Sequence, residues 1–228
     1  MVVDFHIHCY DRPLRAPESF VAFMDRELAK SHGSFAKFLE RYGSAASYLR
    51  VLDEAGADYG VILAELAPIT SAIASNETVE ALCQGQPRLI PVASLNPYLT
   101  ENPARELERL VREHGFRGLK LYPTYSYFYP NDPKLYPVYA KAQELGIPVK
   151  WHTGLRPNVY MEIAGLPPRR LLTYFPPRAR QRQSALRLRL AERATMKGNI
   201  DAIRALALSE GAKERILGGN AARLLKLL

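Results

Sequence analysis

Short apolar runs alternate with longer amphipathic stretches along most of this chain, and this alternation constrains its fold more than any other feature. Apolar runs rich in β-branched residues predict buried strands, and the amphipathic stretches predict helices. Regular strand–helix alternation favours right-handed βαβ units and a parallel sheet. Strands are expected at 2–8, 59–64, 89–95, 116–122 and 147–152.

The helices between these strands carry start and stop signals. Ser44 precedes an amphipathic stretch that Gly56 ends, Pro103 opens a second helix, and Gly146 stops a third. A long polar stretch after the first strand is interpreted as a loop insertion with two short helices. The expected helices are 19–30, 34–42, 45–55, 70–84, 103–114 and 133–145.

Five strand–helix units within residues 2–152 fit a (β/α)8 barrel better than a doubly wound sheet. No Gly-x-Gly-x-x-Gly follows any strand, so a dinucleotide-binding fold lacks its fingerprint. In a barrel, functional residues lie at the carboxyl ends of the strands. Three polar residues in such positions, Asn96, Lys120 and Tyr122, are the candidate substrate-binding residues.

The first strand carries the most distinctive polar pattern, Asp4-Phe5-His6-Ile7-His8. Side chains alternate between the two faces of a strand, so Asp4, His6 and His8 should point one way. Two imidazoles two residues apart can ligate one metal ion, and Asp4 could accept a hydrogen bond from a ligating ring. The alternative is a polar strand end with two solvated histidines.

Composition and length narrow the class of protein. The chain has 228 residues, enough for a single domain over 1–228. It has neither an apolar run near the ~18 residues of a membrane span nor a secretory signal at its start. Two cysteines make no disulfide framework, so a cytoplasmic location without membrane partners is expected.

The net charge of +8 comes from one window, Gly165–Lys197. This window holds eight arginines and one lysine but only one acid, Glu192. Its net charge therefore equals the net charge of the whole chain. A basic amphipathic helix at 185–193 could bind a nucleic acid or a membrane surface. Against that reading, the window has no nucleic-acid motif and only Tyr174 and Phe175 as stacking residues.

Several segments together resemble a known family. The first-strand motif, the run Gly118–Pro123 and the run Ile147–Gly154 are similar to the amidohydrolase superfamily, in the amidohydrolase-related branch that includes aminocarboxymuconate-semialdehyde decarboxylase. The run Ile216–Leu225 resembles the ending of that branch. The resemblance covers residues 1 to about 165 and again from about 197 to the end.

The resemblance implies a distorted (β/α)8 barrel that holds one divalent metal ion, usually zinc. His6, His8 and His152 occupy the positions of the family's metal ligands. The ion would lower the pKa of its bound water to ~7 and make it a nucleophile. The expected partner is a small-molecule substrate, and a homo-oligomer is left open. Lys120 is either a contact for a substrate carboxylate or a lysine whose side chain snorkels to solvent at a strand end.

Two pieces of the family pattern are missing. No histidine follows His152, so the strand-six acid/base has no counterpart, and the only aspartate after it is Asp201, expected at a helix start. We therefore expect an incomplete barrel of about six strands, the last at 158–164, and an aberrant Arg-rich segment at 165–197. An internal deletion with a local frameshift, or a gene-model error, would explain both.

The missing groups leave the catalytic residues unassigned. The sequence predicts a metal-dependent hydrolase or a related decarboxylase. The loss of the two groups is expected to impair its activity. A non-catalytic degenerate paralogue or fragment is the alternative. Glu65 and Lys120 are the residues that could take over proton transfer.

Overall fold

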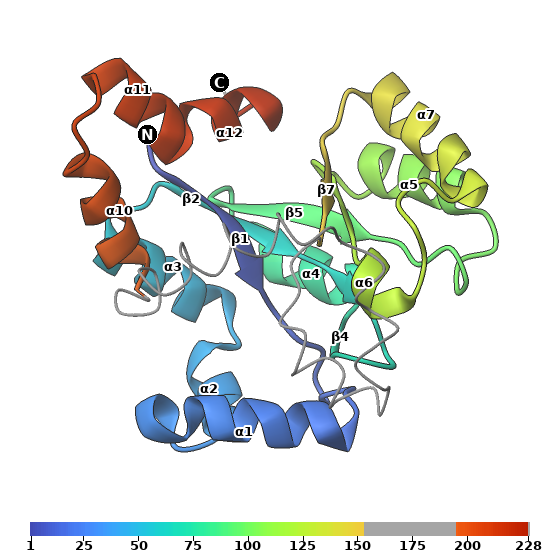
Figure 1. The fold of residues 1–228 in the computed structure, drawn as a ribbon, viewed down its shortest axis with the longest axis horizontal. Helices are drawn as coiled ribbons and strands as arrows, with labels where there is room; N and C mark the ends of the chain where they lie inside the picture. Colours follow the sequence, from blue (N-terminus) through green and yellow to red (C-terminus); the bar gives the residue numbers. More distant parts are fainter. Residues whose placement is uncertain (153–194, 228) are drawn as a thin grey trace, which may run out of the picture.

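The computed structural model describes residues 1–152 and 195–227, and its main feature is a curved sheet (Figure 1). Five parallel strands form this sheet in the order β1-β2-β5-β6-β7. They make up half of a barrel, which confirms the predicted parallel sheet and incomplete barrel. The strands are β1 (Val3–His8), β2 (Tyr59–Leu63), β5 (Leu89–Ser94), β6 (Leu119–Leu121) and β7 (Val149–Trp151).

The predicted strand at 158–164 and most of the Arg-rich segment at 165–197 lie outside the described residues. In the parts of the chain that the structure covers, no helix is long and apolar enough to cross a membrane. The helices are α1 (Glu18–His32), α2 (Phe35–Tyr42), α3 (Ala45–Ala55), α4 (Asn76–Cys83), α5 (Pro103–Arg112), α6 (Pro123–Ser126), η1 (Pro133–Leu135), α7 (Tyr136–Leu145), α10 (Met196–Arg204), α11 (Glu210–Glu214), η3 (Arg215–Gly219) and α12 (Asn220–Leu224).

Helices cover one face of the sheet and form the main core with it. Leu52 of α3, Leu107 of α5 and Val138 of α7 are fully buried in the same cluster as Ile62 and Leu119 of the strands. The signals read from the sequence explain where α3 begins and ends. Ser44 and Ser47 form a capping box at its start, and Gly56 takes the left-handed conformation, with φ of 69°, at its end.

The helix predicted at 70–84 begins later than expected, at Asn76. Residues before it form a short antiparallel ladder in which β3 (Glu65–Leu66) pairs with β4 (Ile73–Ala74). Ser75 then caps α4, and its hydroxyl accepts a hydrogen bond from the backbone N–H of Thr78 at 3.2 Å. The prediction was wrong for 70–75 because pairing with β3 outweighs local helix preference.

Strand β1 departs from simple alternation. Its pairing with β2 shifts register between Asp4 and Ile7. Val3 and Phe5 pack in a cluster with Val61, whereas Ile7 packs in the main core on the side of the helices. Simple alternation predicts that Val3, Phe5 and Ile7 share the face opposite Asp4, His6 and His8. This prediction is wrong for Ile7, because the irregularity turns the strand between Phe5 and Ile7.

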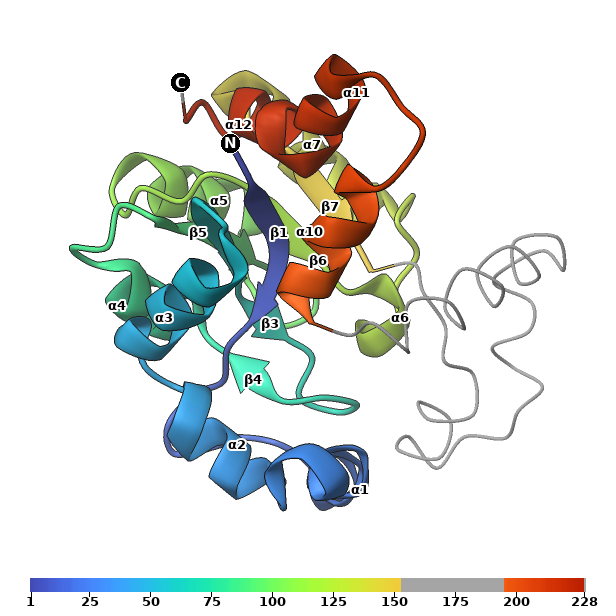
Figure 2. The same cartoon turned by 90° about the vertical axis from the view of Figure 1, so that its left-hand side faces the viewer.

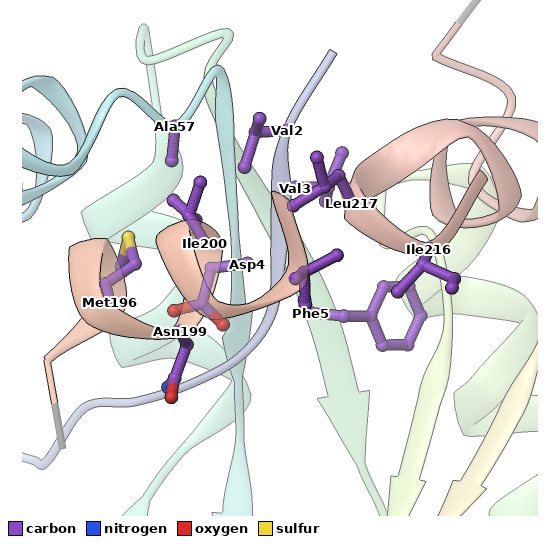
Figure 3. A pocket seen from close by; sticks show the side chains of 11 residues that line it. Val2, Val3, Asp4, Phe5, Ala57, Met196, Asn199, Ile200, Ile216 and Leu217 are labelled. Atoms are coloured by element: carbon purple, nitrogen blue, oxygen red, sulfur yellow. The ribbon is translucent and has the colours of Figure 1, made fainter. Parts of the chain in front are cut away.

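The C-terminal helices lie against the amino end of β1 (Figure 2). Leu225 is buried against Val3 and Val61, and the Arg117 guanidinium donates to its carbonyl at 3.2 Å. Helix α10 lies beside β1, and a pocket opens between α10, β1 and η3 (Figure 3). Its lining is mainly apolar, with Asp4 and Asn199 as polar members. Asp201 lies inside α10, not at its start as predicted, and pairs with Lys197 at 2.6 Å.

Candidate metal and substrate site

His6 and His8 meet at the carboxyl end of β1. Their Nε2 atoms are 3.1 Å apart, and their ring centroids 4.9 Å apart. Two nitrogens bound to one tetrahedral ion at ~2.1 Å would lie roughly 3.4 Å from each other. The pair therefore has the spacing that two ligands of a single divalent metal ion require.

The buried carboxylate of Glu65 holds the second of these rings. Its Oε2 lies 3.1 Å from Nδ1 of His8, and the residue is 3 % exposed. A proton on Nδ1 directed at this carboxylate leaves the Nε2 lone pair free, facing His6. Glu65 thus has the role predicted for Asp4, whose Oδ1 instead accepts a hydrogen bond from the backbone N–H of His6 at 3.0 Å.

The remaining oxygen of Glu65 is unusual for a buried carboxylate. Within the described parts of the chain, Oε1 has no hydrogen-bond partner. Buried polar atoms are nearly always paired, because an unpaired one keeps the full cost of its desolvation. A cation or a proton donor bound at this end of the sheet would satisfy it.

His152 follows β7 and faces a group of aromatic side chains. Its ring lies 4.3 Å from that of Tyr125 and 6.0 Å from that of Tyr122, between centroids. Across residues 1–152 and 195–227, no three His, Cys, Asp or Glu side chains are grouped as a metal site. The structure brings His6 and His8 together, and the site with His152 as third ligand stays a prediction.

Asn96 and Tyr122 are both engaged by the protein itself. The Asn96 amide donates to the carbonyl of Leu66 at 3.1 Å and accepts the backbone N–H of Tyr98 at 3.0 Å. The Tyr122 hydroxyl donates to the carbonyl of Ala64 at 3.2 Å, and burial raises its pKa well above the usual value. Both side chains hold the loops at this edge of the sheet in place.

Lys120 and Lys150 bring positive charge to the same region. Lys120 is 1 % exposed, and its Nζ lies 4.7 Å from the centre of the Tyr122 ring. The ammonium of Lys150 reaches across to β1 and donates to the carbonyl of Phe5 at 2.7 Å. Burial lowers the pKa of each lysine to about 8, and Lys150 contributes to the shift of Lys120.

Lys150 was not predicted as a site residue, although a charged residue inside the apolar run 147–152 is a usable signal. Burial, the neighbouring His8 and then the two lysines lower the pKa of His6. Its ring is therefore neutral near pH 7, as a metal ligand must be.

The sequence as a whole shows which protein family the chain belongs to. Residues 3–197 match the model of the amidohydrolase family. The chain belongs to the amidohydrolase family. This match confirms the resemblance seen in the sequence. It also includes the Arg-rich window, which the resemblance did not cover. No curated protein sequence matches the chain.

Solved structures share the fold of this amidohydrolase. The 5-carboxyvanillate decarboxylase of Sphingomonas paucimobilis has a TM-score of 0.60 at 15 % identity, covering 99 % of this chain and 98 % of that one. An uncharacterised TIM-barrel protein of Bordetella bronchiseptica has a TM-score of 0.58 at 21 % identity, with 99 % and 98 % covered. Both support a fold derived from the (β/α)8 barrel.

A third structure contains a metal. The 5-carboxyvanillate decarboxylase of Novosphingobium aromaticivorans DSM 12444, with bound manganese and 3-methoxy-4-hydroxy-5-nitrobenzoic acid, has a TM-score of 0.52 at 19 % identity. The match covers 73 % of this chain and 55 % of that protein. The amidohydrolase chain thus spans about half the length of this relative.

Proposed function

We propose that this chain is a metal-dependent hydrolase or decarboxylase that acts on a small carboxylate-bearing molecule. The observation that carries the proposal is the meeting of His6 and His8, 3.1 Å apart between Nε2 atoms and supported by Glu65. These residues lie at the carboxyl end of a parallel strand, where barrel enzymes keep their active sites. Solved structures of the same fold include decarboxylases, one of them with bound manganese.

The described side chains have distinct parts in this proposal. His6, His8 and His152 would hold one divalent ion, with zinc the first expectation for three nitrogen ligands. The ion would supply a polarised water or substrate oxygen. Lys120 would neutralise a substrate carboxylate, while Asn96 and Tyr122 shape the wall beside it.

Metal analysis of the purified protein tests this proposal. We expect one equivalent of a divalent metal in the wild type and less than about a tenth of that in His6→Ala and His8→Ala, since each variant removes a ligand. His32→Ala is the matched control, because that ring packs against Phe38 in the insertion. A wild-type protein that binds no divalent metal after incubation with zinc or manganese would reject the proposal.

A non-catalytic relative is the second candidate. One observation favours it: among the residues that the structure describes, no three metal-ligating side chains are grouped. The decisive measurement is turnover of small aromatic carboxylic acids by the metal-loaded protein. Stoichiometric metal without turnover by wild type would support this reading, and turnover that His6→Ala abolishes would reject it.

The cytoplasmic location remains a prediction, and the oligomeric state remains open. Size-exclusion chromatography with light scattering gives the oligomeric state directly. Binding of nucleic acid or membranes through the Arg-rich window rests on residues that lie almost wholly outside the described ranges. Retention on heparin that falls with salt would favour it.

A further inference from the structure

Strand β1 contains an extra residue at the first histidine of the candidate site. In the pairing of β1 with β2, two residues, Phe5 and His6, stand opposite the single residue Val61. This is the arrangement of a β-bulge, which is rare between parallel strands and re-aims the side chains that follow it. Bulges are common next to active sites, and this one lies in the strand that carries both histidines.

The bulge decides which face of the sheet the two histidines occupy. Phe5 packs with Val61 on one side, whereas Ile7, two residues later, packs with the helices on the other side. His8 follows Ile7, so alternation returns it to the side of Phe5, and the ring of His6 lies beside it. A change of register by one residue turns every later side chain to the other face. Without the bulge, both imidazoles would face the helices.

Charged side chains hold the peptide group between Phe5 and His6 at both of its ends. Its N–H donates to Oδ1 of Asp4 at 3.0 Å, and its carbonyl accepts from Nζ of Lys150 at 2.7 Å. The carboxylate thus meets the positive end of the peptide dipole and the ammonium meets the negative end. Burial lowers the pKa of Lys150 to about 8, and the nearby Asp4 carboxylate opposes this shift. Both charges act on one peptide group inside the bulge.

We propose that Asp4 and Lys150 are positioning residues, which hold the bulge and thereby aim His6 at the metal position that it shares with His8. The inference rests on the proposed function, because it concerns a ligand of the proposed metal site. Rotation of the held peptide group would carry the Cα–Cβ bond of His6 with it. The ring lies several bonds from this group, so a small rotation would move its Nε2 away from that of His8, now at 3.1 Å.

Competition for zinc with a chelator tests this role in the full chain. We expect Asp4→Ala and Lys150→Met each to weaken zinc binding by about tenfold or more, as the loss of a group that orients a metal ligand does. For Lys150 the expected direction opposes simple electrostatics, since removal of a positive charge near a cation should tighten its binding. Asp4→Asn keeps the acceptor and Lys150→Arg keeps the charged donor, so both should stay within about threefold of the wild type.

Lys120→Met is the matched control for Lys150→Met. Lys120 has the same charge on the neighbouring strand and also acts electrostatically on His6, but its ammonium lies over the Tyr122 ring, at 4.7 Å from the centre. This variant should bind zinc at least as tightly as the wild type. An equal loss in both lysine variants would overturn the inference, because the loss would then not depend on the bond to the carbonyl of Phe5.

Amide hydrogen exchange in the metal-free protein tests the two contacts without the metal. The rate for the His6 N–H is compared with that for Ile62 in β2, which reports on opening of the sheet. We expect Asp4→Ala to speed exchange at His6 by about tenfold or more relative to Ile62, since a hydrogen bond to a charged acceptor is lost. Lys150→Met should also speed it, and Lys150→Arg should exchange like the wild type.

The two measurements separate this inference from the proposed function. A wild type that binds no zinc rejects the proposed function, while exchange at His6 still decides whether the two side chains hold the bulge. A wild type that binds zinc no more tightly than Asp4→Ala and Lys150→Met keeps the proposed function and overturns the inference. Unchanged relative exchange at His6 in both variants would overturn it as well.

Discussion

Among single residues, Glu65 is the one whose side chain should tune metal binding without contacting the ion. We expect Glu65→Gln to weaken binding of zinc or manganese by about 10–100-fold, because a neutral amide no longer fixes the proton on Nδ1 of His8. Competition with a chelator measures the affinity. Glu54→Gln, on the exposed surface of α3, is the control.

The same variant has a readout that does not depend on turnover. Nitrogen-15 spectra of the imidazoles report which ring nitrogen of His8 carries the proton. The wild type should show the Nδ1–H tautomer, and Glu65→Gln a mixture of tautomers. Unchanged metal affinity together with an unchanged tautomer would show that Glu65 does not orient the ring.

Lys120 should make stability depend on alkaline pH. Burial, together with Lys150, lowers the pKa of Lys120 to about 8, against 10.5 when it is unfolded. The unfolded chain then binds more protons between these values, so this residue makes the protein more stable as pH rises from about 8 to 10.5. The gain is on the order of 2–3 kcal/mol.

Urea unfolding at pH 7.5 and at pH 10 measures this effect against Lys120→Met, which cannot titrate. From pH 7.5 to pH 10, the unfolding free energy of the wild type should rise relative to that of Lys120→Met. A difference that does not change with pH would mean that Lys120 keeps an ordinary pKa in the folded protein.

At the scale of elements, Asp11 joins the insertion to the start of α4. Its Oδ1 accepts hydrogen bonds from the backbone N–H of Ser75 at 2.8 Å and the hydroxyl of Thr78 at 2.6 Å. Its Oδ2 accepts from Arg15. We expect Asp11→Ala to destabilise the fold by about 2–4 kcal/mol, because several charge-assisted bonds are lost at a buried position.

Thermal or urea unfolding measures this loss of stability. Asp25→Ala is a useful comparison, because Asp25 accepts one hydrogen bond, from the backbone N–H of Phe35 at 2.7 Å. Asp11→Ala should cost clearly more than Asp25→Ala. Equal losses would mean that the Asp11 network adds nothing beyond one hydrogen bond.

Elements with a strong local signal could be predicted from the sequence, and those formed by distant pairing could not. The start and end of α3 follow from Ser44 and Gly56, which act on their own helix. The ladder of β3 with β4 depends on two segments meeting in space, so the sequence of 70–75 alone suggested a helix. The turn within β1 likewise depends on its pairing with β2.

For the candidate site, spacing along one strand showed the His6 and His8 pair. The contact of Glu65 with His8 joins two elements, and the approach of Lys150 to Phe5 joins two strands far apart in the chain. No local pattern encodes either contact. They follow from the curvature of the sheet, a property of the whole molecule.

For the whole molecule, a bound metal should raise thermal stability. A ligand that binds only the folded state stabilises it by about 2.7 kcal/mol at a hundred times its Kd. Zinc or manganese should therefore raise the melting temperature of the wild type and leave that of a His6→Ala and His8→Ala double variant unchanged. An equal rise in both proteins would point to binding elsewhere in the chain.

The hydrogen bond from Lys150 to the carbonyl of Phe5 also has a consequence for how the protein folds. It joins residues 145 positions apart, across the first and last of the five strands. Contacts of such long range form only after the chain has given up the entropy of closing a large loop, which slows folding. On the ribosome, the first strand must wait for nearly two thirds of the chain to be synthesised before the sheet can reach its final curvature.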